Sequence, residues 1–192
     1  MNVLVVYSHP NPKSFNHAVL ETITAGLKEA GHAVKVHDLY AEPFKATLDG
    51  TDFGQIMGGT TPPDIQKEQD LVSWAEGLVF IYPVWWFGLP AALKGWIDRV
   101  LLQGFAFAIT PEGLKGLLKH KKALVVNTTG GPEDSYDAGK AKEIYIRPMT
   151  DGTLRFCGIP DVQHKTFFAV PSVPPEVRET MLAEARQLGK AF

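Results

Sequence analysis

Three short apolar runs constrain the fold of this chain more than any other feature. Val3–Tyr7, Leu78–Tyr82 and Ala123–Val126 are each four or five residues long and contain no charged residue. Runs of this length, bounded by polar or turn-forming residues, are typical of strands that are buried on both faces of a parallel sheet. We therefore expect the core of the protein to form around such a sheet.

Segments with helical periodicity separate these runs. Apolar residues recur at helical spacing from Phe15 to Leu27, and Gly31 stands where such a helix would end. Further helices are predicted at Asp64–Glu76, opened by Pro62 and Pro63, at Pro90–Leu102, in a segment ending near Phe156, and at Glu176–Lys190. Two weaker strands are predicted at Ala33–Val36 and Thr166–Val170, and residues 40–63 are predicted to be a long connection without regular structure.

Strict alternation of strand and helix implies crossover connections, which place helices on both faces of a parallel sheet. The predicted fold class is therefore α/β: a doubly wound, five-stranded parallel sheet with helices on both faces. We expect a single domain that spans residues 1–192, because this length suits one domain of ordinary size.

Composition excludes several classes of protein. A net charge of -2 argues against a surface that binds nucleic acid, which needs clustered positive charge. The most apolar window, Leu78–Leu93, is 16 residues long and interrupted by prolines, whereas a membrane span needs about 20 apolar residues. The N-terminus enters the first apolar run without a basic flank, so no signal peptide is expected. We expect a cytoplasmic protein that does not insert into membranes.

Ligands of open α/β sheets bind beyond the carboxyl ends of the strands, where the strand order reverses. The loop after the first run leads directly into a helix, whose N-terminus favours anions. In this loop Ser14 and Asn16 are donors, while Lys13 and His9 are possible cations. Neither the glycine-rich dinucleotide motif nor the Walker motif is present. The loop is a candidate phosphate site, although Ser14 as a plain helix cap and His9 as a plain loop residue explain it equally well.

The loop after the third predicted strand is strongly aromatic and runs from Pro83 to Gly88. Trp85, Trp86 and Phe87 are consecutive, so their side chains diverge and cannot all enter one core. Part of this surface is therefore expected to face a ligand or a partner chain. A flat tricyclic ring would fit here. The alternative is ordinary packing between helix and sheet, which applies most strongly to Trp96.

The loop after the fourth predicted strand combines hydroxyl donors with glycines that permit close approach of a ligand to the backbone. It reads Asn127, Thr128, Thr129, Gly130, Gly131, and Tyr136 follows five residues later. The phenol of Tyr136 is a candidate to lie over the same site. A plain glycine turn is the alternative.

Taken in order, these motifs resemble the NAD(P)H:quinone oxidoreductases of the flavodoxin-like superfamily, the diaphorase group, and in length their shorter bacterial relatives. The resemblance extends from Val3 to about Leu188. Its motifs are His9 with Ser14–Asn16, Pro83–Gly88, Leu93–Val100, Phe105–Phe107, Thr128–Gly131 and Phe156–Gly158. It implies a flavodoxin-like fold, a flavin held without covalent attachment, and an active site at a homodimer interface.

The resemblance also implies a role for each group of residues. The flavin phosphates would contact His9, Ser14, Phe15 and Asn16. The ring system would contact Pro83, Val84, Trp85, Trp86 and Phe87 on one side and Thr128, Thr129, Gly130, Gly131 and Tyr136 at its other polar edge. Arg178 stands where the family has an arginine near the adenine of FAD, which favours FAD over FMN. Trp86, Phe107 and Phe156 would hold the nicotinamide or the quinone.

Two departures from the family pattern affect the expected chemistry. The longer relatives carry a histidine shortly after the tyrosine that matches Tyr136, but this chain has none between Asp137 and Arg147. Lys140 or Lys142 would supply the positive charge instead, so Tyr136 and Lys142 are the catalytic candidates. The long C-terminal extension of the eukaryotic enzymes is also missing, and with it part of their nicotinamide site.

The implied reaction is a two-electron hydride transfer from NADH or NADPH, through flavin N5, to a quinone or similar planar acceptor by a ping-pong mechanism. Reduction of azo or nitro compounds would be the same chemistry on another acceptor. One alternative is a flavodoxin-type electron carrier, which the small net charge and the loop around His9 disfavour. Another is a flavin-binding ancillary subunit that regulates a membrane transporter, and the sequence leaves it open.

Three further predictions concern residues outside these loops. Cys157, the one cysteine, is expected to be a small buried apolar residue, and it excludes both an intrachain disulfide and a cysteine metal cage. Asp98 and Arg99, together with Lys94, are expected to form pairs at a helix surface or an interface. The remaining histidines show no metal-ligand spacing, so no metal site is expected.

Overall fold

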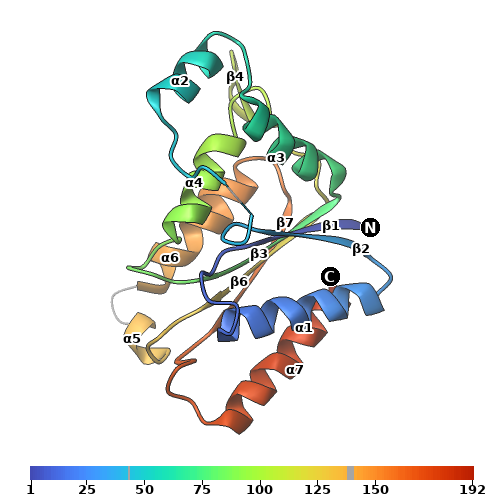
Figure 1. Cartoon of the computed structure of the whole chain (residues 1–192), viewed down its shortest axis with the longest axis vertical. Coiled ribbons are helices and arrows are strands. Elements are labelled where there is room, and N and C mark those ends of the chain that lie inside the picture. Colours follow the sequence, from blue (N-terminus) through green and yellow to red (C-terminus); the bar gives the residue numbers. More distant parts are fainter. Residues whose placement is uncertain (43, 138–140) are drawn as a thin grey trace.

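The computed structural model describes residues 1–42, 44–137 and 141–192 (Figure 1). The strands are β1 (Asn2–Tyr7), β2 (Ala33–Asp38), β3 (Gly77–Pro83), β4 (Phe107–Thr110), β5 (Gly113–Gly116), β6 (Lys122–Thr128) and β7 (Asp161–Phe167). The helices are α1 (Phe15–Glu29), α2 (Gly50–Met57), α3 (Pro63–Trp74), α4 (Ala91–Val100), α5 (Asp134–Asp137), α6 (Ala141–Met149), the π-helical η2 (Thr150–Arg155) and α7 (Pro175–Ala191).

The central sheet has five parallel strands in the order β2-β1-β3-β6-β7. Helices α1 and α7 cover one face of this sheet, and α3, α4 and α6 cover the other (Figure 1). The predicted doubly wound fold is therefore confirmed. The order of the strands reverses between β1 and β3, because the chain first builds outward from β1 to β2 and then continues on the other side of β1.

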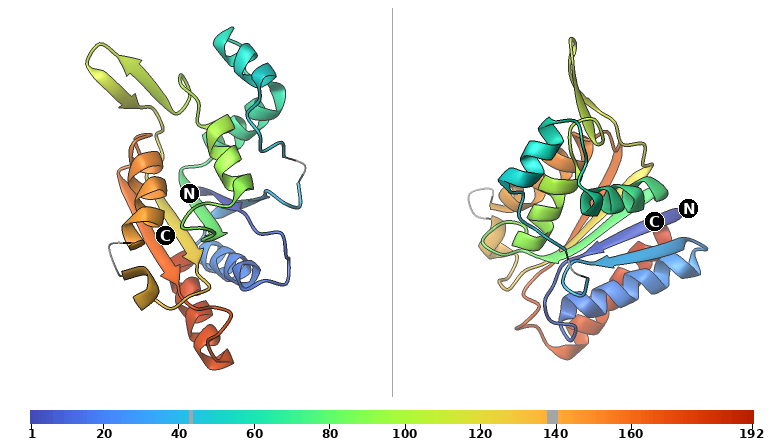
Figure 2. Two further views of the ribbon diagram at one scale, coloured as in Figure 1. Left: turned by 90° about the vertical axis from the view of Figure 1, so that its left-hand side faces the viewer. Right: turned by 45° about the horizontal axis from the view of Figure 1, so that its top comes forward.

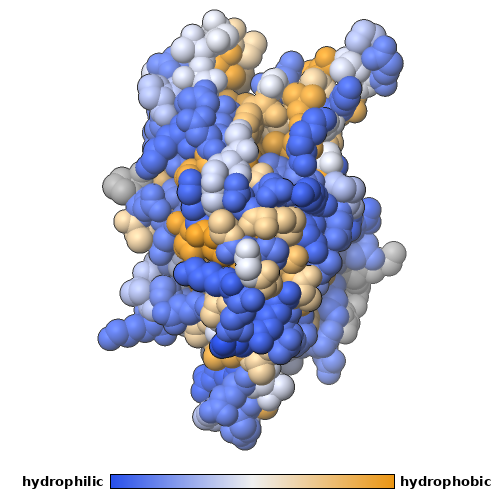
Figure 3. All heavy atoms as spheres, turned by 90° about the vertical axis from the view of Figure 1, so that its right-hand side faces the viewer, coloured by the Kyte–Doolittle hydropathy of each residue, from blue (hydrophilic) through white to orange (hydrophobic). Residues whose placement is uncertain are grey.

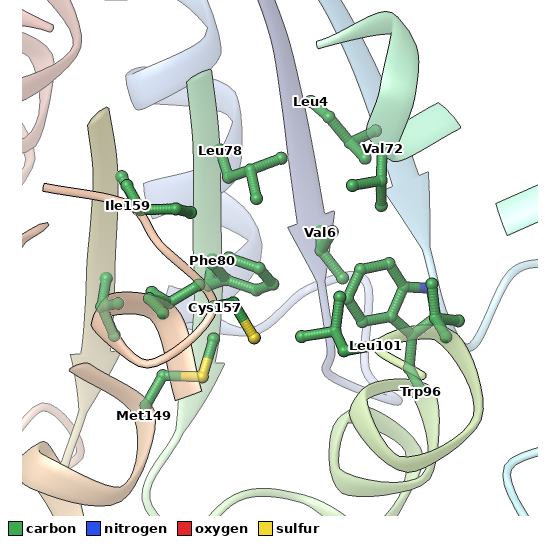
Figure 4. Packing of buried hydrophobic residues seen from close by; sticks show 14 of the residues in the cluster. Leu4, Val6, Val72, Leu78, Phe80, Trp96, Leu101, Met149, Cys157 and Ile159 are labelled. Carbon is green, nitrogen blue, oxygen red and sulfur yellow. The ribbon is translucent and has the colours of Figure 1, made fainter. Parts of the chain in front are cut away.

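The core strands are apolar throughout because both of their faces are buried. Alternate residues of β1 enter two separate clusters, Leu4 and Val6 on the face of α3 and α4, and Val3 and Val5 on the face of α1 and α7. Figure 4 shows Leu4 beside Val72 of α3 and Val6 near Trp96 of α4, with Cys157 in the same cluster. The prediction for Cys157 is confirmed: the residue is buried, and burial raises the pKa of its thiol to about 11.

Helix α1 begins and ends where its sequence predicts. Ser14 caps its N-terminus, and the Ser14 Oγ accepts a hydrogen bond from the backbone N–H of His17 (3.2 Å). The first turn contains no acidic residue. At the other end Gly31 has a φ of 81°, a conformation that glycine adopts without strain.

Two predictions about regular structure were wrong. The fifth strand of the sheet is Asp161–Phe167 and not Thr166–Val170, because this edge strand is only partly buried and its sequence lacks a continuous apolar run. Residues 40–63 are not wholly irregular, since α2 lies within them. Asp49 caps α2 in a capping box with Asp52, a signal that the surrounding glycines obscure.

The antiparallel hairpin β4–β5 was also not predicted. It lies at the same end of the molecule as α2 (Figure 2), and its Ile109 and Leu114 side chains are mostly exposed. On the face at the right of Figure 1, hydrophilic residues predominate and hydrophobic residues gather in smaller groups (Figure 3). In the described part of the chain, no helix combines the length and apolar character required to span a membrane.

Candidate functional site

A cleft of about 840 Å³ lies beyond the carboxyl ends of β1, β3 and β6, next to the point where the strand order reverses. Three loops form it: the loop between β1 and α1, the aromatic loop after β3, and the threonine- and glycine-rich loop after β6. The segment after β7 and Arg178 of α7 complete one end. The cleft therefore occupies the position where open α/β sheets bind ligands.

The first wall of the cleft is the N-terminus of α1 with the loop that precedes it. The Tyr7 hydroxyl lies 3.4 Å from Ser14 Oγ, which fixes the cap against the end of β1. Asn16 is buried, its Nδ2 donates to Thr128 Oγ1 (2.8 Å), and its buried Oδ1 has no partner among the described residues. A buried acceptor without a partner costs free energy, so this oxygen is expected to accept a hydrogen bond from a ligand.

His9 contributes a hydrogen-bond donor to the same wall. The backbone N–H of Asn11 donates to His9 Nδ1 (3.0 Å), which leaves the ring proton on Nε2. Burial lowers the pKa of His9 from its ordinary value, which favours the neutral ring. In this form His9 is suited to donate a hydrogen bond to a phosphate.

The second wall is a tight turn from Trp85 to Gly88. The backbone N–H and C=O groups of these two residues pair with each other (3.1 and 3.0 Å). Both residues between them, Trp86 and Phe87, have positive φ angles, 52° and 54°. This region is unfavourable for bulky residues and costs on the order of 1 kcal/mol each. The Trp86 side chain is 99% exposed, so the turn presents a large aromatic surface instead of burying it.

The third wall is the loop after β6 together with α5. The backbone N–H of Val84 donates to the Thr128 carbonyl (2.8 Å) and so joins the second and third walls. Tyr136 lines the cleft, and its ring lies 5.5 Å from that of Phe87, centroid to centroid. Gly131 lies directly against Tyr136, since a Cβ added to Gly131 would be 3.4 Å from the tyrosine ring.

Most of the residues predicted to contact the cofactor lie around this one cleft. Those that line it are His9, Ser14, Phe15, Asn16, Pro83, Val84, Trp85, Trp86, Thr128, Thr129, Gly130, Tyr136 and Arg178. Phe87 and Gly131 do not line it but contact Tyr136, which does. Sequence reasoning missed Asn11, Val170 and Pro171 as lining residues. Asn11 stands in a loop already singled out, whereas Val170 is placed by a backbone hydrogen bond from its N–H to the Thr129 carbonyl (3.1 Å) that no local pattern reveals.

Other predicted site residues lie elsewhere. Phe107 and Phe156 contact each other, with ring centroids 5.4 Å apart, but neither lines the cleft within one chain. Lys142 forms an ion pair with Glu133 and lines a neighbouring recess of about 270 Å³. Lys140 lies outside the described residues. A single chain therefore assembles the predicted cofactor wall but not the predicted aromatic enclosure for the substrate.

Arg99 corrects the prediction of a surface or interface pair. Lys94 and Asp98 do pair at the surface of α4, but Arg99 is fully buried and bonds to Asp52 (3.0 Å) and Asp64 (2.6 Å). Burial opposes the charge of Asp52, but hydrogen bonds from Arg99 and Lys45 outweigh it and lower the Asp52 pKa to about 2. Arg99 thus fixes the segment from Lys45 to Asp64 against α4.

The strand order and the position of the cleft define the flavodoxin-like class, in which the ligand lies at the switch point between the first and third strands. A family model described as flavodoxin-like fold matches residues 1–190. An uncharacterized NAD(P)H oxidoreductase of Haemophilus influenzae is 33% identical over 192 residues, covering 100% of this chain and 95% of the relative.

Two further relatives carry more specific names. The mouse ribosyldihydronicotinamide dehydrogenase [quinone] is 35% identical over 213 residues, covering 99% of this chain and 91% of its own. The solved structure of an NAD(P)H:quinone oxidoreductase from Methanothermobacter marburgensis is 33% identical, with a TM-score of 0.88 and coverage of 99% and 96%. The chain belongs to the flavodoxin-like NAD(P)H:quinone oxidoreductase family.

Proposed function

We propose that this chain is an NAD(P)H:quinone oxidoreductase that holds a flavin in the cleft beyond β1, β3 and β6. The observation that carries the proposal is the composition of the cleft: an anion-binding helix N-terminus at one wall and an exposed aromatic turn at another. Such a site suits a ligand that has phosphate at one end and a flat ring at the other. The relatives that share the family are named as oxidoreductases of NAD(P)H or as quinone dehydrogenases.

The residues present fit a flavin. The first turn of α1 lacks acidic residues, and its backbone N–H groups favour a phosphate together with Ser14 and the Nε2 proton of His9. The buried Asn16 Oδ1, which has no partner among the described residues, would accept a hydrogen bond from a hydroxyl of the flavin side chain. Arg178 lies at the far end of the cleft, and its place favours FAD, with FMN as the alternative.

A bound flavin supplies reversible hydride transfer, and the chain supplies position and hydrogen bonds. Trp86 offers a flat exposed face on which a nicotinamide or a quinone can stack. The nicotinamide and the quinone would stack on this same face one after the other, so the two substrates are expected to bind in alternation. The Tyr136 phenol would donate a hydrogen bond at the polar edge of the ring system and stabilise negative charge there.

A second copy of the chain would complete the substrate pocket. Phe107 and Phe156 pair with each other away from the cleft, and Phe156 is 37% exposed. Ile109 and Leu114, on the same hairpin as Phe107, expose further apolar surface. Exposed apolar surface of this kind is typical of an interface. We therefore include a homodimer in the proposal, in which each copy brings these aromatic rings to the cleft of the other.

The test is a visible spectrum of the purified protein, with the released flavin identified by mass and the oligomer sized by light scattering. Initial rates of NADH and NADPH oxidation with a small quinone would follow. The proposal predicts a yellow dimer whose double-reciprocal plots are parallel. A colourless protein that gains no thermal protection from FAD or FMN would overturn it. A yellow protein that does not oxidise NAD(P)H would instead indicate an electron carrier, and co-purification with a transporter would indicate an ancillary subunit.

A further inference from the structure

Tyr136 is held in the cleft by the rings around it. Its ring contacts three others, Phe87 after β3 (5.5 Å between centroids), Tyr145 on α6 (5.6 Å) and Phe168 after β7 (6.0 Å). The helix that carries Tyr136, α5, is only four residues long. A helix of this length has little stability of its own, so the position of Tyr136 depends on these neighbouring rings.

Tyr145 is the one ring of the three that is both buried and joined to the sheet through its hydroxyl. The residue is 3% exposed, and its hydroxyl lies 3.3 Å from Thr166 Oγ1 on β7. Phe87 is 45% exposed, and the side chains of Phe87 and Phe168 cannot form hydrogen bonds. Tyr145 is therefore the neighbour that can best fix the place of Tyr136.

A chain of hydrogen bonds at the carboxyl ends of β6 and β7 holds the Tyr145 hydroxyl in turn. Thr166 Oγ1 donates to Asn127 Oδ1 (2.7 Å), and Asn127 Nδ2 lies 3.1 Å from His164 Nε2. Since the single proton of Thr166 is used by Asn127, the Tyr145 hydroxyl must be the donor to Thr166. Since Asn127 Nδ2 can only donate, His164 must accept and is neutral.

The charge state of His164 agrees with this assignment. Burial, together with the positive charge of Lys142, lowers the His164 pKa to about 4. At neutral pH each hydrogen bond therefore has a single direction, from Tyr145 to Thr166, then to Asn127, then to His164. Thr166 Oγ1 also lies 3.4 Å from His164 Nε2, which closes the group on itself. A buried group of hydrogen-bonded side chains restricts the arrangement of its members.

We propose that Tyr145 is a positioning residue for Tyr136 and that Thr166, Asn127 and His164 hold Tyr145 in place. This inference rests on the proposed function, since Tyr136 matters only if a flavin lies in the cleft. It assigns a task to Tyr145, Thr166 and His164, which the sequence motifs do not include, and joins them to Asn127 of the loop after β6. The catalytic contact remains that of Tyr136, and the network acts only through it.

The first experiment uses the flavin-free protein, so that it does not depend on flavin binding. All five tyrosines are labelled as 3-fluorotyrosine, and the Tyr136 signal is assigned in the ¹⁹F spectrum with Tyr136→Phe. We expect Tyr145→Phe and Thr166→Val to shift or broaden the Tyr136 signal, because the link to β7 is lost. Thr166→Ser keeps the hydroxyl and is expected to leave the signal in place. An unchanged Tyr136 signal in both Tyr145→Phe and Thr166→Val would overturn the inference.

The second experiment measures flavin reduction by NAD(P)H in the loaded enzyme. Tyr145→Phe is expected to slow reduction about threefold to tenfold, a fraction of the effect of losing Tyr136 itself. In a Tyr136→Phe background the same change is expected to have no further effect, since residues that act through one another are not additive. Ile65→Val, a core truncation on α3, serves as the control for lost stability and is expected to leave the rate unchanged.

The two experiments separate the ways in which the inference can fail. An equal loss of rate with and without the Tyr136 hydroxyl, or no loss at all, would show that Tyr145 does not act through Tyr136. If no flavin binds, the proposed function fails, and the ¹⁹F spectrum still decides whether the network positions Tyr136.

Discussion

Trp86 and Trp96 lie on either side of the start of α4, and they differ in burial: the side chain of Trp86 is exposed, whereas that of Trp96 is buried. Trp86 is almost fully exposed on a backbone in the left-handed region. Trp96 is fully buried against Phe80, and its Nε1 donates to Glu68 Oε2 (3.0 Å). Exposure and backbone strain oppose stability and persist where a ligand needs them. In the proposed function the turn before α4 contacts the ligand, whereas the body of α4 packs in the core.

Other residues on the buried side of α4, besides Trp96, support the fold. Arg99 joins α4 to Asp52 and Asp64, and Gly95 lets the backbone of Ala46 cross the helix closely. A Cβ on Gly95 would lie 1.8 Å from the Ala46 carbonyl oxygen, so this crossing requires glycine. Changes on this side should therefore alter stability, whereas changes at the cleft should alter catalysis.

The largest effect is expected at Arg99. Arg99→Met removes the buried cation beside Asp52 and leaves only the half-exposed Lys45 to pair with this carboxylate, so it is expected to cost about 3–5 kcal/mol of unfolding free energy. Urea denaturation of the flavin-free protein measures this loss. Asp98→Ala, on the exposed side of the same helix, is the matched control and should change stability little. A well-folded Arg99→Met protein with altered substrate kinetics would contradict the division of tasks.

The next largest effect is expected at Tyr136. It should lower the rate of catalysis and leave the free energy of unfolding nearly unchanged. Tyr136→Phe removes the phenol donor at the cleft and should lower the rate of flavin reduction about ten- to a hundredfold, less than the loss of a strong oxyanion donor. Stopped-flow absorbance measures this rate, and urea denaturation should show nearly unchanged stability. Tyr40→Phe, at an exposed tyrosine after β2, is the control. Reduction at the wild-type rate would exclude the proposed role.

The sequence predicted the cleft better than the region that supports it. The walls of the cleft follow directly after apolar runs that mark their own strands, so position in the chain located them. Arg99 could not be found in this way. It stands next to Asp98 in a helical pattern that looks solvent-exposed, and its burial depends on α2, which the glycines around Asp49 concealed.

The remaining predictions failed at the edge strand of the sheet and where residues far apart in the sequence contact each other. Strand β7 is covered less completely than β6 and lacks a continuous apolar run, so its position was misjudged by several residues. Phe107 and Phe156 meet because the hairpin before β6 folds beside the end of η2, which no local periodicity indicates. Their place at the cleft depends on the proposed dimer, on which the pattern of one chain gives no information.

At the strained turn from Trp85 to Gly88, a substitution is expected to raise the stability of the protein instead of lowering it. Trp86→Gly relieves a left-handed backbone and loses almost no buried surface, so the flavin-free protein is expected to gain about 0.5–1 kcal/mol of stability. The same change removes the face on which substrates would stack, so the KM for the quinone should rise. Urea denaturation and steady-state kinetics measure the two effects. A loss of stability would show that the exposed ring supports the fold.

The smallest effect is a pH dependence on the buried side. His37 lies between Glu68 (2.9 Å) and Glu42 (3.2 Å). Burial opposes its charge, but hydrogen bonding and the charges of both carboxylates outweigh burial and raise the His37 pKa above its ordinary value. The folded state therefore binds the proton more tightly than the unfolded state. This contribution is complete below about pH 6.5 and is lost as the pH rises through the raised value.

Unfolding free energies measured from pH 6 to pH 9 should thus decline more steeply in the wild-type protein than in His37→Gln. His32 and His164 have lowered pKa values, so their effect has the opposite sign and falls below pH 6.5, outside most of this window. Trp86→Gly should keep the wild-type slope, because the aromatic turn holds no part of the His37 cluster. Equal slopes in wild type and His37→Gln would mean that the two carboxylates do not hold the proton, and the stability of this side would then rest on Arg99 and apolar packing alone.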